Sequence, residues 1–215
     1  MGVLTSNSGI FLQGFIITLE LFGLAAAGSL LLGTLLGVLR VSPVPVCRAI
    51  GTTYVGVFRN TPLTLVFFFF VFAYPLLDIV SISYFTAAVI ALTVYTAAFV
   101  CEVVRAGINT VPAGQAEACR ALGMSFGQLV TSVVLPQAVR AVVPPLVSTM
   151  IALLKNTTVA AGFSVAEAGA IRSVLSERGE NQLVVLAWVA LGFVIVVLLL
   201  TLLQRALERR WAVAR

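Results

Sequence analysis

Five long apolar segments constrain this chain more than any other feature of its sequence. A helix needs about 20 mostly apolar residues to cross about 30 Å of hydrocarbon. Of the 215 residues, 60% are hydrophobic and 10% are charged, a balance typical of membrane proteins. We therefore expect one all-α membrane domain with about five transmembrane helices. Their predicted spans are about residues 10–39, 61–77, 80–101, 139–161 and 183–203.

Prolines disturb two of these segments. The second, residues 61–77, is the weakest because it is short, rich in phenylalanine and ended by Pro75. The fourth contains Pro144 and Pro145, which remove backbone hydrogen bonds but are tolerated where neighbours satisfy the freed groups. We expect a kink in the fourth span.

Basic residues predict the orientation, because Lys and Arg in short loops are retained on the cytoplasmic side. Most arginines lie between segments one and two, between three and four, and after segment five: Arg40, Arg48, Arg59, Arg105, Arg120, Arg140, and four from Arg205 to Arg215. A multi-pass cell-membrane protein with its N-terminus outside and its C-terminus cytoplasmic follows. The net charge of +5 then reflects sidedness, and we expect no nucleic-acid partner.

The loop between spans three and four, about residues 106–136, carries the most specific pattern. Pro112 suits the first turn of a helix, and helix-forming residues follow it. At 100° per residue, Cys119 and Leu122 share one face while Glu117 lies on the other. The pattern predicts a short amphipathic helix outside the membrane.

Two residues predict how this helix ends and the next begins. Gly123 fits the position just past a helix end, where a left-handed conformation is favoured. Ser125 and Gln128 form an S-x-x-Q capping box, which satisfies free backbone donors. The second helix is expected to run to Leu135 and to meet Pro136, which bends the chain toward span four.

The stretch GMSFG, residues 123–127, also has the G-x-S-x-G spacing of a hydrolase nucleophile elbow. A serine nucleophile needs a base, but the chain has no histidine, and its sole lysine, Lys155, is predicted across the membrane from Ser125. A phosphate-binding P-loop is excluded because Leu154 precedes Lys155 where glycine is required. We expect no enzyme activity, no catalytic residue, no metal site and no cofactor in this chain.

The loop resembles the EAA loop of ABC importer permeases, the transmembrane subunits of ATP-driven uptake systems. Seven residues match that pattern: Glu117, Ala118, Cys119, Gly123, Val133, Leu135 and Pro136. The flanks YTAAFVCEVVRAGI (95–108), LLKNTT (153–158) and FRNTPL (58–63) are similar to those of the polar amino-acid permeases of the histidine, glutamine and glutamate type. The resemblance covers roughly residues 10–210.

The resemblance implies that the EAA helix is a coupling helix that docks on a separate ABC ATPase. The docking residues it implies are Glu117, Ala118, Cys119, Gly123, Leu135 and Pro136. Closure of an ATPase dimer that uses ATP would rock the membrane helices in alternating access. The implied partners also include a second permease subunit, a paralogue in preference to an identical copy, and an extracytoplasmic amino-acid-binding protein. A solvated Glu117 paired with Arg120 is the alternative without a docking role.

In relatives the fourth span lies by the translocation path, so the resemblance implies substrate contacts there. The residues concerned are Lys155, Asn156, Thr157 and Thr158. Asn156 stands where many relatives have aspartate, and the missing negative charge favours an acidic or neutral amino acid. Glutamate is the expected substrate, with glutamine or a basic amino acid as alternatives. Ionisable groups in a membrane are functional candidates, although Lys155 can instead snorkel to the outer headgroups.

Three other charged residues have alternative interpretations. Glu102 and Arg105 lie one turn apart at the end of span three, as an ion pair within the helix or as contacts to the loop or a partner. Glu20 lies deep in span one, and its carboxyl is protonated, faces a partner or lines the path. A channel or membrane anchor is the alternative class of protein, which the docking loop argues against.

Overall fold

The computed structural model describes residues 2–211, with side chains to residue 206, and these residues form helices without a strand. Four helices are long and apolar enough to cross a membrane, and a fifth candidate is a bent pair of helices. The expectation of an all-α protein with about five spans is therefore confirmed. The orientation and the exact span boundaries stay predictions. The side chains after residue 206, among them those of Arg209, Arg210 and Arg215, lie outside the described part of the chain.

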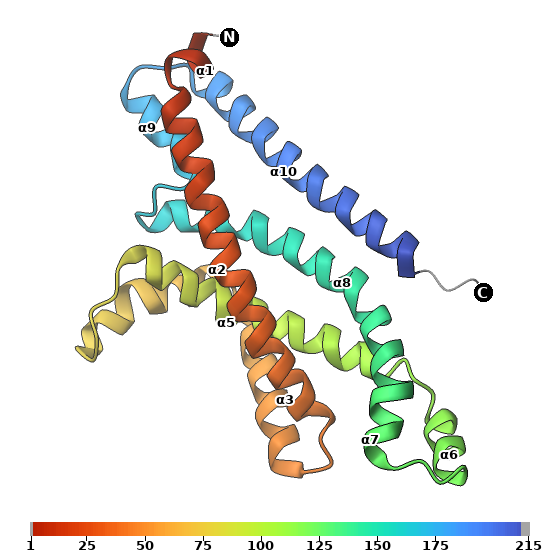
Figure 1. The fold of residues 1–215 in the computed structure, drawn as a ribbon. Coiled ribbons are helices and arrows are strands. Elements are labelled where there is room, and N and C mark those ends of the chain that lie inside the picture. The colour runs from red at the N-terminus through yellow and green to blue at the C-terminus, as the bar shows by residue number, and fades with distance from the viewer. Residues whose placement is uncertain (1, 212–215) are drawn as a thin grey trace.

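The four spanning helices differ in regularity (Figure 1). The first is α2 (Ser8–Val41), the second is α5 (Tyr84–Ile108), and the last is α10 (Gln182–Trp211). The third is a continuous helix from Phe126 to Phe163. It consists of α7 (Phe126–Leu129), η3 (Val130–Val134), α8 (Leu135–Asn156) and η4 (Thr157–Phe163).

The fifth candidate span is broken by Pro62. Helix α3 (Pro45–Asn60) is followed by a run of α4 (Leu63–Phe68), η1 (Phe69–Ala73) and η2 (Tyr74–Leu77), and the chain is bent by 102° between the two parts. Proline disfavours helical backbone angles in the residue before it. Thr61, which precedes Pro62, is accordingly extended, with φ −98° and ψ 131°. The remaining short helices are α1 (Gly2–Ser6), α6 (Ala113–Ala121), η5 (Ala168–Ala170) and α9 (Ile171–Glu177).

The structure corrects the expectation that the helix after Ser125 ends where it meets Pro136. The helix continues through Pro136, and a π-helical turn, η3, lies immediately before it. Proline lacks an N–H and its ring clashes with the carbonyl four residues earlier, whereas a π-turn widens the helix locally and moves that carbonyl away. A second π-turn, η1, precedes Pro75 in the same way.

Small residues allow α2 to pack closely along α5. A Cβ atom on Gly33 would lie 2.7 Å from the carbonyl oxygen of Ala97, so only glycine fits there. Close approach of this kind is the usual means by which membrane helices associate, because lipid supplies no hydrophobic drive between them.

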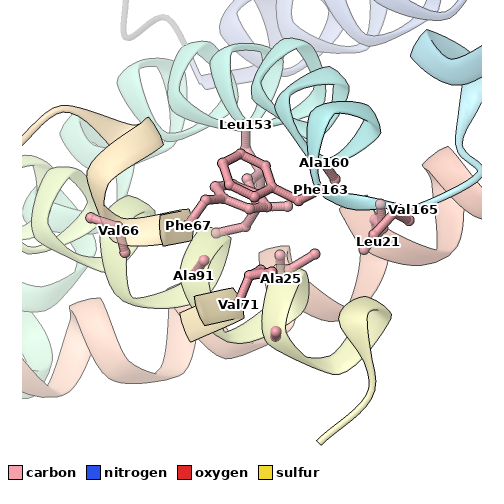
Figure 2. Packing of buried hydrophobic residues seen from close by; sticks show 13 residues of the cluster. Leu21, Ala25, Val66, Phe67, Val71, Ala91, Leu153, Ala160, Phe163 and Val165 are labelled. Atoms are coloured by element: carbon pink, nitrogen blue, oxygen red, sulfur yellow. The ribbon is translucent and has the colours of Figure 1, made fainter. Parts of the chain in front are cut away.

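The main core lies where α2, α5, the broken span and the end of the third spanning helix meet (Figure 2). Phe67 and Phe163 are stacked there, with ring centroids 4.9 Å apart. Leu21 of α2 and Leu153 of α8 are fully or almost fully buried in the same cluster. In contrast, α10 exposes a series of large apolar side chains along its length, as expected of a helix that faces lipid or another subunit.

Candidate functional site

The loop between α5 and α8 has the local structure that its sequence predicts. Gly123 follows α6 with a positive φ of 76°. The Ser125 hydroxyl accepts a hydrogen bond from the backbone N–H of Gln128 at 3.3 Å, and the Gln128 side-chain oxygen accepts one from the Ser125 N–H at 2.9 Å. The predicted capping box is confirmed, so the Ser125 hydroxyl serves to begin a helix. Figure 1 places α6 and α7 at the end of the molecule away from the N-terminus.

Nearly all of the residues predicted to dock on a partner are exposed. Glu117, Ala118 and Gly123 are exposed, as are Leu135 and Pro136 at the start of α8, while Cys119 is buried. The Gln137 side-chain amide donates to Gln115 at 2.8 Å. This bond holds α6 beside the start of α8 and brings both parts of the predicted docking set into one region.

Two large apolar side chains on this loop were not singled out by their sequence pattern as docking residues. Leu122 is 83% exposed and Phe126 is 76% exposed. Leu122 is the residue that ends α6, and Phe126 is the first residue of α7, directly after the capping serine. Exposed apolar groups rimmed by polar residues mark interaction surfaces, so these two extend the candidate docking surface of α6.

A second cluster joins three helices through one carboxylate. Glu102 of α5 pairs with Arg40 of α2 at 2.6 Å, with Arg105 at 3.0 Å and with Arg59 of α3 at 3.3 Å. The ion pair between Glu102 and Arg105 is one of the two arrangements that the sequence allowed. The partners Arg40 and Arg59 were not predicted, because they are distant in sequence and no local spacing indicates them.

A cavity of about 340 Å³ lies beside this cluster, between α2, α3 and α5. Its lining is mostly polar and consists of Arg40, Thr52, Val55, Gly56, Arg59, Asn60 and Glu102. Three guanidinium groups contact one carboxylate, which leaves an excess of two positive charges among the described side chains. We call this the arginine cavity.

The four residues predicted to contact substrate do not converge on one site. Lys155 is exposed and lines a hollow with apolar side chains of α10. The hydroxyls of Thr157 and Thr158 donate at 2.7 Å to the carbonyls of Leu154 and Lys155, within their own helix. Only Asn156 reaches a cavity between α5 and α8.

That second cavity, which we call the α5–α8 cavity, has a volume of about 390 Å³. It is lined by Tyr95, Thr96, Phe99, Ser148, Thr149, Ala152, Leu153 and Asn156. Hydroxyl, amide and aromatic groups can hydrogen-bond and pack against a small polar molecule. The described lining contains no charged side chain. The Arg59 guanidinium carbon lies 5.7 Å from the centroid of the Phe99 ring, which forms part of that lining.

The charged residue that sequence reasoning passed over is Glu167. Its side chain is fully buried, and its oxygens accept hydrogen bonds from the Gly169 N–H at 2.7 Å and the Thr18 hydroxyl at 3.0 Å. Burial raises the pKa of this carboxyl, and the two hydrogen bonds offset part of that rise. Through the Gly169 bond, Glu167 caps the start of η5. The glycine two residues after it was the only local sign of this cap in the sequence.

Glu20 has a different environment from Glu167. It is exposed on α2 and lines a shallow hollow with Phe85 of α5 and Ser164 to Ala166. It forms no ion pair with the side chains that the structure describes. Glu20 is not among the residues that line the α5–α8 cavity.

Comparisons with known proteins agree with these features. Residues 29–213 match the family described as binding-protein-dependent transport system inner membrane component. The chain is 43% identical over 216 residues to the glutamate transport system permease protein GluC of Corynebacterium efficiens, covering 95% of each chain. It is 38% identical over 159 residues to the probable glutamine ABC transporter permease protein GlnM of Bacillus subtilis, covering 74% of this chain and 73% of the relative.

A solved structure gives the same result for the fold. It describes an amino acid ABC transporter with histidines, and one of its chains superposes with a TM-score of 0.91 at 27% identity, covering 97% of each chain. The likeness extends over the arrangement of all the helices that position the two cavities and the α6 loop.

Proposed function

This chain belongs to the family of inner membrane components of binding-protein-dependent transport systems, and we propose that it translocates an acidic amino acid, glutamate in first place. It is a multi-pass permease subunit of a polar amino-acid ABC importer and not an enzyme, since ATP hydrolysis in such systems lies in a partner subunit. Family membership also decides against the channel and membrane-anchor alternatives.

The α5–α8 cavity is the observation that carries the choice of substrate. A cationic amino acid in this cavity would meet no carboxylate among the described lining residues, and burying an unpaired charge is costly. An acidic side chain would instead lie near the Arg59 guanidinium behind Phe99. The relatives described as glutamate permeases support the same substrate.

We further propose that the ATPase docks on α6 and the start of α8. The exposed Glu117 offers a charge, and Leu122 and Phe126 offer apolar surface beside it. The Gln115–Gln137 hydrogen bond ties α6 to α8, whose far end carries Asn156. Because the helix is continuous from Phe126 to Phe163, it would pass a displacement of α6 to the α5–α8 cavity.

The complete importer would contain further subunits. We propose a dimer of ABC ATPases, a second permease subunit and an extracytoplasmic amino-acid-binding protein. The exposed apolar side chains of α2 and α10 provide the surface on which a second permease subunit could pack. A paralogue is proposed for that subunit in preference to an identical copy.

Competition of uptake tests the substrate. Proteoliposomes that contain the complete importer, its binding protein and ATP would take up radiolabelled glutamate, with an excess of unlabelled glutamate, glutamine, arginine or histidine added in turn. Glutamate should compete most strongly. Strongest competition by glutamine would support the second candidate, since the amide and hydroxyl lining also suits a neutral side chain, and strongest competition by arginine would refute the argument from Asn156.

A further inference from the structure

We propose that the arginine cavity is a second binding site for the transported amino acid. In this site Arg59 leaves Glu102 and pairs with the side-chain carboxylate of the substrate. The inference rests on the proposed function, because it assumes an acidic substrate. It adds a site and a specificity-determining residue outside the α5–α8 cavity.

Charge is the first argument for this site. Three guanidinium groups contact the single carboxylate of Glu102, and a guanidinium binds carboxylates through a planar fork of donors. One carboxylate cannot offer every one of these donors a good acceptor. The cavity therefore has capacity for a second carboxylate, and Thr52 and Asn60 supply further polar groups in its lining.

The three arginines are not equally available to a ligand. Arg40 is 13% exposed and lies 2.6 Å from Glu102, whereas Arg59 is 45% exposed and lies 3.3 Å from it. A longer and more exposed ion pair is the weaker one. Arg59 is thus the arginine that can leave Glu102 at least cost while Arg40 and Arg105 keep the carboxylate paired.

The position of Arg59 connects the two cavities. Its guanidinium lies against the ring of Phe99, and Phe99 lines the α5–α8 cavity. On α5, Phe99 and Glu102 are three residues apart and so lie on one face. An amino acid that moves along this face from the α5–α8 cavity passes Phe99 and reaches Arg59, at the side that the arginine distribution predicts to be cytoplasmic.

Lipid is the competing explanation, since arginines near a membrane surface can bind phosphate headgroups. The amino acid is favoured because Arg59 stacks on a residue of the substrate cavity, an arrangement that headgroup binding does not require. The exchange also gives a reason for the excess charge to lie next to that cavity, where it attracts an anion toward the exit.

Binding of radiolabelled glutamate and glutamine to the complete permease–ATPase complex tests the inference. Arg59→Gln should weaken glutamate binding about tenfold, the scale of one lost charge-assisted hydrogen bond, and change glutamine binding less than about twofold. Arg48→Gln is the matched control, because Arg48 is an exposed arginine of the same helix that does not line the cavity, and it should change neither.

A second variant tests the exchange in the opposite direction. Glu102→Gln removes the group that competes for Arg59, so it should tighten glutamate binding while glutamine binding stays constant. A variant that only damages folding cannot produce this gain. Unchanged glutamate binding in Arg59→Gln, or equal losses for glutamate and glutamine, would overturn the inference.

Two controls separate the remaining outcomes. The binding assay is repeated in membranes of phosphatidylcholine alone and with anionic phosphatidylglycerol. An effect of Arg59→Gln that occurs only with the anionic lipid would assign the cavity to headgroups and overturn the proposal. Uptake by the unmodified importer is measured in parallel: if it carries no glutamate, the proposed function fails, whereas normal glutamate uptake with an unaltered Arg59→Gln affinity removes only the inference.

Discussion

The hydroxyl oxygen of Thr18 lies 3.0 Å from Oε2 of Glu167, a buried contact that ties α2 to the segment after the third spanning helix. The same hydroxyl accepts a hydrogen bond from the Ala168 N–H at 3.0 Å. Glu167 also accepts from the Gly169 N–H. Thr18, Glu167 and Ala168 are buried, so these hydrogen bonds satisfy polar groups that would be costly to leave unpaired.

Replacing Glu167 should therefore lower the stability of the protein. Glu167→Ala leaves the Gly169 N–H without its acceptor, at an expected cost of about 2 kcal/mol, while the Thr18 hydroxyl can still donate to the Gly14 carbonyl. Glu167→Gln keeps an acceptor and a donor in place and should cost less. Thermal unfolding of the purified complex measures both, with Glu177→Gln as an exposed control. Equal melting temperatures for Glu167→Ala and the control would contradict a structural role.

The raised pKa of Glu167 predicts a pH dependence. Its pKa in the folded protein is higher than its ordinary value of 4.5, so the folded state holds the proton more tightly than the unfolded state. The stability from this carboxyl is fully present below pH 4.5 and is lost as the pH rises through the raised folded pKa. Melting temperature measured across this range should fall less steeply in Glu167→Gln. Identical pH profiles for the two proteins would refute the assignment.

Gly123→Ala should weaken the association between this chain and its ATPase. Gly123 has a positive φ of 76°, and a side chain there costs about 1 kcal/mol whatever space surrounds it. Gly127→Ala is the matched control, because that glycine is equally open to an added Cβ but has no positive φ. Co-purification of the ATPase with each variant measures the effect, and equal recovery for both would argue against α6 as the docking element.

Leu122→Ser should lower ATPase association without lowering the melting temperature. Leu122 is 83% exposed, so the change removes apolar surface from a proposed interface and little from the core. Leu183→Ser serves as the control, since Leu183 is 77% exposed at the start of α10, on the N-terminal side in Figure 1. If both variants bind the ATPase as tightly as the unmodified chain, Leu122 lies outside the interface.

Local features of this protein could be predicted from the sequence. The capping box of Ser125 and the left-handed Gly123 depend on residues within one or two turns, and the apolar segments locate the helices. The end of the second helix at Leu135 was predicted wrongly, because a π-turn accommodates Pro136 and the sequence pattern gives no sign of that turn.

Contacts between distant segments could not be predicted in this way. Arg40 and Arg59 reach Glu102 only because α2 and α3 pack on α5, and the Thr18–Glu167 contact likewise joins residues far apart in sequence. Lys155 and Asn156 are adjacent in sequence but line different cavities, since successive residues of a helix point about 100° apart.

Dependence of uptake on the partner ATPase tests the central claim most directly. Glutamate uptake would be measured in proteoliposomes with the binding protein and the permease subunits, with and without the ATPase and with and without ATP. An importer permease predicts uptake above background only when both the ATPase and ATP are present. Uptake that persists without the ATPase would contradict the account and identify the chain as a carrier or channel.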